Sequence, residues 1–119
     1  MTSYKDFIKS TKSSENIIMR VNEEFNEELK AQQKGSQTPG LSDIPTPNLN
    51  LLQNRYSETG SQGRKILSAL SRLDIAWDRA KKMKKSGAAK KKRDFHMSLR
   101  TNYEMNLNKI SKELEDRNN

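Results

Sequence analysis

Apolar residues recur at spacings of three and four in the second half of the chain, and this periodicity limits the fold more than any other feature of the sequence. Five residues follow such a repeat, namely Ile66, Leu70, Leu73, Trp77 and Ala80. A β-strand would instead alternate apolar and polar residues with a period of two. The spacing therefore predicts an amphipathic helix over residues 66–80, with the a and d pattern of a heptad.

The same periodicity occurs in two other parts of the chain, so we expect three helical segments and an all-α fold. In the first segment, the hydroxyls of Ser10 to Ser14 compete for backbone hydrogen bonds and mark a point where the helix can break. The N-terminal stripe comprises Tyr4, Ile8, Ile18, Val21, Phe25 and Leu29, and the C-terminal stripe comprises Phe95, Leu99, Tyr103, Leu107, Ile110 and Leu114.

All three prolines, Pro39, Pro45 and Pro47, lie in a stretch rich in glycine, serine and asparagine. Proline lacks a backbone donor and restricts the residue before it, which disfavours a helix or a central strand. We therefore expect a disordered or extended central linker over residues 35–56. It separates an N-terminal amphipathic helical segment (1–34) from a helical hairpin or long interrupted helix (57–117).

The chain is poor in strong hydrophobes, because leucine, isoleucine, valine and phenylalanine together account for only 22 of its 119 residues. This is close to the level of about one fifth below which a charged chain is suspected of disorder. The sequence thus predicts elongated helices, in a hairpin or coiled-coil-like bundle, that cannot bury their stripes alone. On this hypothesis the stripes bind a protein partner, in a homo- or hetero-oligomer.

The net charge of +8 comes from one region, because residues 64–100 hold thirteen basic side chains against three aspartates. Within it, residues 79–93 contain no acid, and no apolar stripe runs through them. We call this stretch the basic tract. Its cations are Arg79, Lys81, Lys82, Lys84, Lys85, Lys90, Lys91, Lys92 and Arg93.

The backbone of the basic tract has two interpretations. Gly87 can end a helix, and the first plausible N-cap after it is Asp94, which together predict a mobile hinge between two helices. Alternatively, one long helix continues through a weak point at Gly87. In the hinge interpretation, the stripes 66–80 and 95–114 form a hairpin with the basic tract at its tip.

Four uses of the basic tract are open: nonspecific phosphate binding, nuclear import, contact with an anionic membrane or acidic partner, and solubility alone. Lysine outnumbers arginine by seven to two in the tract, and no aromatic residue lies within it. Base stacking and bidentate base readout rely on aromatic and arginine side chains. Any nucleic-acid contact is therefore expected to be nonspecific.

Residues for catalysis or metal binding are sparse. The chain has no cysteine, and its one histidine, His96, has no partner at metal-ligand spacing. We predict no catalytic residue, no metal site and no cofactor, and hence no enzyme. Trp77, the only tryptophan, is interpreted as an anchor in the core or at an interface.

These patterns predict a non-enzymatic structural or adaptor subunit of a helical assembly, whose basic tract contacts a polyanion. The alternative is a small nucleic-acid-binding or packaging protein that uses the tract for phosphate contact. The sequence shows neither an N-terminal apolar run of the signal-peptide type nor a stretch of membrane-spanning length. We therefore expect an intracellular location, cytoplasmic or nuclear, which includes a viral protein made in a host cytoplasm.

Overall fold

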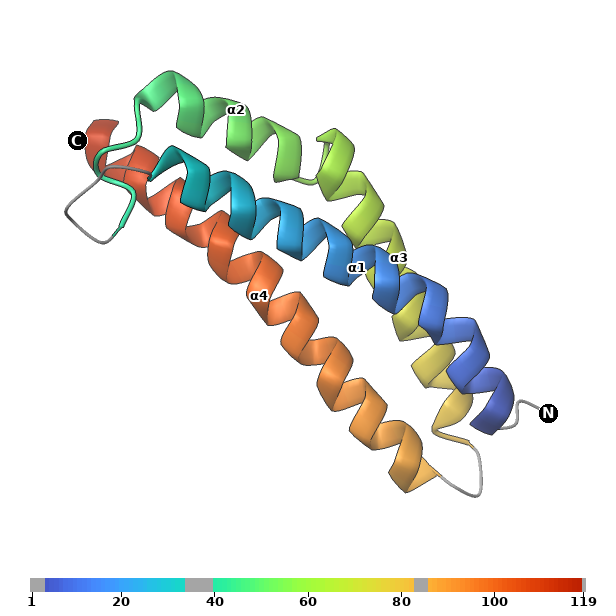
Figure 1. The fold of residues 1–119 in the computed structure, drawn as a ribbon. Helices are drawn as coiled ribbons and strands as arrows, with labels where there is room; N and C mark the ends of the chain where they lie inside the picture. The colour runs from blue at the N-terminus through green and yellow to red at the C-terminus, as the bar shows by residue number, and fades with distance from the viewer. Residues whose placement is uncertain (1–3, 34–39, 83–85, 119) are drawn as a thin grey trace.

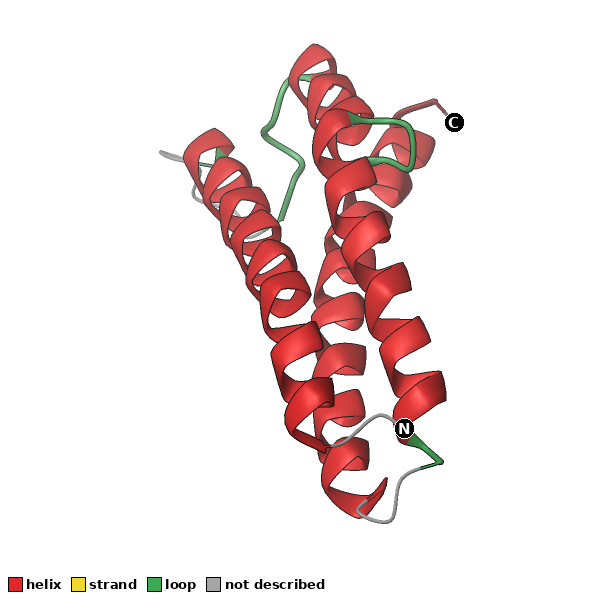
Figure 2. Cartoon of the chain, turned by 90° about the vertical axis from the view of Figure 1, so that its right-hand side faces the viewer, coloured by secondary structure: helices red, strands yellow, loops and turns green. Residues whose placement is uncertain are grey.

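The chain folds into an elongated bundle of helices, 52 × 27 × 23 Å in extent. The computed structural model describes residues 4–33, 40–82 and 86–118, and these contain no strand (Figures 1 and 2). The prediction of an all-α, elongated fold is confirmed. The described helices are α1 (Tyr4–Gln32), α2 (Thr46–Tyr56), α3 (Ser61–Ala80) and α4 (Ser86–Asn118).

The four helices make three antiparallel legs. Helix α1 forms the first leg, α2 and α3 return together as a kinked second leg, and α4 forms the third (Figure 1). Helix α1 packs on α3 and α4, while α2 packs on α3 and α4. The start of α1, the end of α3 and the start of α4 consequently meet at one end of the bundle, which we call the basic end. The other end, with α2 and the C-terminus, is the apolar end.

The kink in the second leg depends on two glycines. Gly60 is the N-cap of α3, and a Cβ atom on it would lie 2.0 Å from the backbone oxygen of Asn54. A Cβ atom on Gly63 would lie 1.6 Å from the backbone oxygen of Ser57. Only a residue without a side chain allows the first turn of α3 to come this close to the end of α2.

Helix α2 lies within the segment predicted to be a linker, so that prediction is wrong for residues 46–56. Pro45 is its N-cap and Pro47 lies in its first turn, where a backbone N–H has no intrahelical partner in any helix. Both prolines are therefore compatible with a helix that begins here. The buried Leu49, Leu52 and Tyr56 then face the rest of the bundle. Residues 35–39 of the predicted linker lie outside the described part.

The apolar end contains the main core. The Phe25 and Tyr56 rings stack with centroids 3.9 Å apart, and the buried Tyr103 hydroxyl donates to the backbone oxygen of Tyr56. Burial raises the pKa of Tyr103 to about 12. The cluster contains Ile18, Val21, Phe25, Leu29, Leu41, Ile44, Leu49, Leu52, Tyr56, Ile66, Ala69, Leu70, Leu73, Leu99, Tyr103, Ile110 and Leu114.

Most of the stripe residues predicted to bind a partner are in this core. The prediction that the helices cannot bury their stripes alone is therefore wrong. Its error has a physical cause, because α2 and the turn before it add apolar side chains that the sequence interpretation had assigned to a linker. Among the predicted stripe residues, Trp77, Leu107 and Ile8 are half-buried, and the Tyr4 side chain lies outside the described part.

Helix α1 runs unbroken through its hydroxyl-rich stretch. The hydroxyls of Ser10 and Thr11 donate to the backbone oxygens of Phe7 and Ile8, 3.0 and 3.2 Å away, so they bond within the helix instead of ending it. Phe7, which the predicted stripe missed, is fully buried.

The chain reverses between α3 and α4, so the hairpin interpretation is confirmed against one continuous helix. Gly87 is the second residue of α4 and is not the hinge, because α3 ends at Ala80 and α4 begins at Ser86. The prediction of a helix start at Asp94 is also wrong. On α4, Phe95 remains 38% exposed, whereas His96 and Asn106 are buried in place of apolar residues.

Candidate functional site at the basic end

Five cations of the basic tract are exposed at the basic end: Arg79, Lys81, Lys82, Lys90 and Lys91. They come from the last turn of α3, the residues after it and the first turns of α4, which the hairpin brings together (Figure 1). Lys81 lies 3.4 Å from Asp78, but this pair is well exposed and is of the kind that stabilises a fold little. Lys84 and Lys85 lie outside the described residues.

A small apolar cluster holds the three helices together beneath these cations. It consists of the buried Phe7, Ala80 and Ala89, one from each helix that reaches the basic end, with Ile8, Ala76 and Trp77 around them. Lysines near the start of α4 face the positive end of its dipole, which disfavours a helix there. Burial of Ala89 against its neighbours offsets this local cost and explains why α4 begins earlier than the capping signals predicted.

Two other tract residues contact the bundle rather than only solvent. Lys92 Nζ lies 3.1 and 3.0 Å from the two carboxylate oxygens of Glu15 on α1. The Arg93 guanidinium lies 5.5 Å from the centroid of the Trp77 ring, in a cation–π contact between α4 and α3. Lys92 and Arg93 therefore have structural partners within the bundle, and the prediction that the tract cations contact a polyanion stays a prediction.

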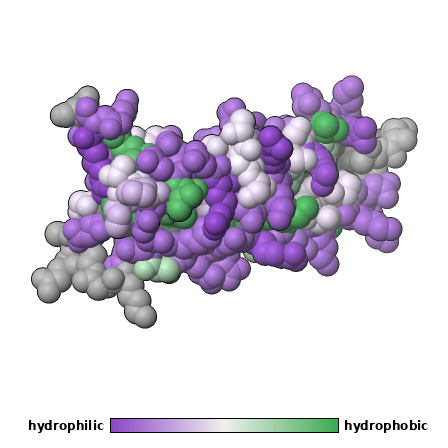
Figure 3. Space-filling view, turned by 90° about the horizontal axis from the view of Figure 1, so that it is seen from above, coloured by the Kyte–Doolittle hydropathy of each residue, from purple (hydrophilic) through white to green (hydrophobic). Residues whose placement is uncertain are grey.

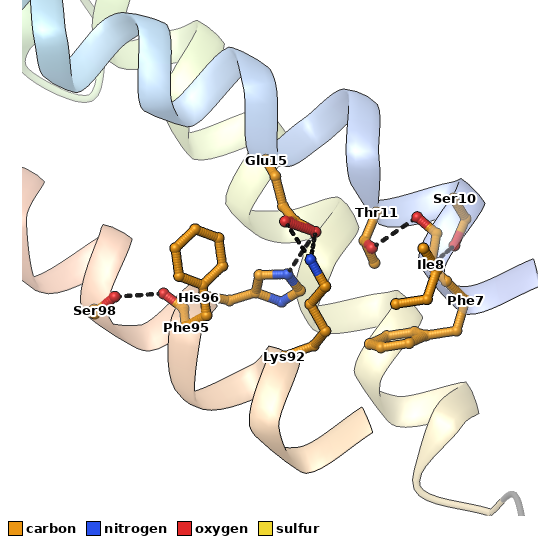
Figure 4. Close-up of polar contacts among 9 residues, drawn as sticks. All are labelled: Phe7, Ile8, Ser10, Thr11, Glu15, Lys92, Phe95, His96 and Ser98. Atoms are coloured by element: carbon orange, nitrogen blue, oxygen red, sulfur yellow. Dashed lines mark hydrogen bonds and ion pairs between the residues drawn. The ribbon is translucent and has the colours of Figure 1, made fainter. Parts of the chain in front are cut away.

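Glu15, Lys92 and His96 form a polar cluster between α1 and α4, which we call the buried ion cluster (Figure 4). Glu15 and His96 are only 6% and 5% exposed. His96 Nε2 lies 3.4 Å from Glu15 Oε1, and the ring lies between those of Phe7 and Phe95. Burial lowers the pKa of His96 from its ordinary value of 6.5, and the Lys92 charge acts in the same direction while Glu15 opposes it.

The buried ion cluster joins α1 to α4 by charge. A carboxylate taken out of water needs a counter-charge, and the Lys92 ammonium supplies it. Because His96 is held neutral, it adds no second cation at neutral pH. Within the described residues, no group of three or more His, Cys, Asp and Glu side chains is arranged to hold a metal ion.

Further polar contacts continue along the α1–α4 interface towards the apolar end. Asn22 Nδ2 donates to the backbone oxygen of Leu99 over 3.1 Å, and Asn106 Nδ2 donates to Asn26 Oδ1 over 2.8 Å. The sequence pattern did not identify the three asparagines or Glu15, because a search for apolar periodicity passes over polar side chains. A signal was present, since Thr11 and Ser14 continue the three-and-four spacing of Phe7, Ile18 and their neighbours and are themselves buried.

One face of the molecule carries small apolar patches rather than a broad apolar surface (Figure 3). On the face in Figure 3, hydrophobic residues are separate and are surrounded by hydrophilic ones.

None of the described helices has both the length and the apolarity that a bilayer span requires. No protein-family model, curated protein or solved structure matches this chain. The function is therefore argued from the geometry alone.

Proposed function

We propose that this protein is a non-catalytic polyanion-binding protein whose basic end contacts the phosphate backbone of nucleic acid without reading its sequence. The observation that supports this proposal most is the convergence of Lys81, Lys82, Lys90 and Lys91, all exposed, at the turn between α3 and α4. Lysines that neutralise phosphates release condensed counterions, and this gives affinity that is independent of base sequence.

The side-chain types at the basic end favour this mode of binding over base recognition. Its exposed cations near the start of α4 are lysines, which act as mobile point charges on a backbone. Two aromatic rings lie near these lysines. Trp77 is half-buried and is covered by Arg93, so it is poorly placed to stack on a base. Phe95, one helical turn after Lys91, is 38% exposed, and the Lys92 ammonium lies 5.6 Å from its ring centroid.

Assembly into a larger helical complex is the second candidate function. Burial of the predicted stripes removes its original basis, because side chains such as Ile66, Leu73 and Ile110 are not available on the surface. Its support now comes from an apolar side chain that the fold leaves outside the core, Ile75 on α3, which is 52% exposed.

Binding to a fluorescent single-stranded oligonucleotide, measured over a range of salt concentrations, tests the proposal. The logarithm of the binding constant is expected to fall linearly with the logarithm of salt concentration, with a slope of about 0.7 for each phosphate contacted. Replacing the four lysines by glutamine should reduce the magnitude of that slope by about 3.

The matched control is Lys109→Gln with Lys112→Gln, because these exposed lysines lie on the same helix near the apolar end. The control should leave the salt slope unchanged. Equal losses for each charge removed in the two variants would indicate attraction by overall charge. A shallow slope in the native protein would contradict phosphate binding outright.

A further inference from the structure

Helix α3 has an outward basic face that runs along the helix towards the basic tract and shares Arg79 with it. Its exposed residues recur at spacings of three and four, so they lie on one side of the helix. The face contains no acid, since Asp74 and Asp78 lie towards its edge. Its members are Lys65, Ser68, Arg72, Ile75 and Arg79, all exposed.

Ile75 is the one apolar member of this face and is 52% exposed. Together with Ala76 it lies in a groove of about 350 Å³ between α3 and the start of α1, where Asp6 and Ser10 form the opposite wall. The groove is large enough for one or two partner side chains. An apolar floor in such a groove favours an apolar side chain over a phosphate group.

Two arginines, Arg72 and Arg79, line the same groove on either side of Ile75. They are two helical turns apart, roughly 10 Å along α3. Neither forms an ion pair with a described residue, whereas the nearby Asp74 is held by Arg100 at 2.8 Å. Arginine presents a planar fork that binds carboxylates in a bidentate manner, so these side chains are suited to acidic residues of a partner.

We propose that the α1–α3 groove binds an acidic amphipathic helix of a partner protein. In this arrangement an apolar side chain of the partner contacts Ile75 and Ala76, and an aspartate or glutamate one turn to either side contacts Arg72 and Arg79. The charge of the face is complementary to such a helix, and its apolar centre matches the anchor. This surface shares Arg79 with the basic end but none of the four lysines of the proposed function, so the inference does not depend on that function.

Selection from a displayed library of random 16-residue peptides tests the inference. The full-length protein is the bait, and a variant with Arg72→Glu and Arg79→Glu serves for counter-selection. Enriched peptides are expected to contain an apolar residue flanked at three or four positions on both sides by aspartate or glutamate. Absence of specific enrichment, or enrichment of peptides without acidic residues, would overturn the inference.

Fluorescence anisotropy with the most enriched peptide then identifies the surface. Arg72→Gln and Arg79→Gln should each weaken binding about tenfold or more, because each removes a charge-assisted hydrogen bond. Ile75→Ser should also weaken it, while the four-lysine variant of the basic end should leave it nearly unchanged. All seven substituted sites on α3 and at the basic end are exposed, so circular dichroism should show native folding in every variant.

The same experiments distinguish peptide binding from the alternative that the α3 face binds nucleic acid. If Arg72→Gln and Arg79→Gln weaken oligonucleotide binding as much as the four-lysine variant does, and leave peptide binding intact, the face belongs to the polyanion surface and the peptide inference is wrong.

Discussion

The two ends of the bundle are stabilised in different ways. At the apolar end four helices enclose a continuous core, in which the Phe25 and Tyr56 rings stack and the Tyr103 hydroxyl has a backbone acceptor. At the basic end three helices share a small cluster of Phe7, Ala80 and Ala89. The buried ion cluster lies beside it. The difference shows how a chain with few strong hydrophobes can fold, since it concentrates them at one end and uses paired charges towards the other.

Helix α2 causes much of this difference. It covers only the apolar end, where it supplies Leu49, Leu52 and Tyr56 to the core. The basic end has no fourth helix among the described residues, and exposed cations such as Lys81, Lys90 and Lys91 lie there. This end therefore has less apolar burial to hold it closed, and its cations remain available to a ligand.

The largest expected effect is on the free energy of unfolding when one of two fully buried phenylalanines, Phe25 or Phe7, is truncated. Phe25→Ala should lower the free energy of unfolding by about 3–5 kcal/mol, because the rigid surrounding core retains a cavity. Phe7→Ala should cost at least about 1 kcal/mol less, because the thinner cluster at the basic end can collapse around the gap. Urea denaturation of both variants measures the difference. Equal losses would mean that the two ends are packed equally well.

A smaller effect is expected from the buried ion cluster. Glu15→Ala leaves the partly buried Lys92 ammonium without its counter-charge, and we expect a loss of about 1–3 kcal/mol, below that of a fully buried pair because Lys92 can turn to water. A double-mutant cycle with Lys92→Met measures the coupling by thermal denaturation. If the two losses simply add, the charges do not hold α1 to α4.

The smallest effect is a dependence of stability on pH. Because the pKa of His96 is lowered in the folded chain, the unfolded chain binds more protons once the pH falls below the ordinary histidine value of 6.5. Stability should therefore be complete above that pH and should decrease as the pH falls towards the lowered pKa. His96→Leu keeps a side chain in the buried position and should flatten this part of the profile. The melting temperatures of the native protein and of the His96→Leu variant between pH 7.5 and 5 provide the measurement. If the two proteins show the same pH profile, His96 is not the group responsible.

The sequence allowed prediction of the helices whose buried faces are apolar. Ile66, Leu70 and Leu73 follow a strict three-and-four spacing, and they are buried on α3 as that spacing requires. On α4 the spacing was correct at four positions, Leu99, Tyr103, Ile110 and Leu114, whereas Leu107 is only half-buried beside the buried Asn106. It was wrong at Phe95, because the buried neighbour is the polar His96, and hydropathy alone cannot distinguish a histidine that has a buried carboxylate partner from one at the surface.

The remaining parts depended on contacts between distant residues. Pro45 and Pro47 carry the same local signal in a linker and in the first turn of a helix, and only the packing of Leu49 and Leu52 against the bundle selects the helix. The pairing of Lys92 with Glu15 joins residues 77 positions apart. Neither local propensity nor periodicity contains that information, so the basic tract could be located from the sequence but its exposed and paired members could not be separated.

Arg117, close to the end of α4, has a consequence for the order of folding. Its guanidinium pairs with Glu113 and donates to the backbone oxygens of Leu41 and Ser42 and to the Thr46 hydroxyl, which are more than 70 positions earlier in the chain. Such contacts form only after the end of α4 has packed beside the start of α2, because closing so long a loop is entropically costly. They therefore contribute to the barrier against unfolding more than to the rate of folding. The last turn of α4 therefore affects the rate of unfolding more than the rate of folding. The lifetime of the folded chain depends on it.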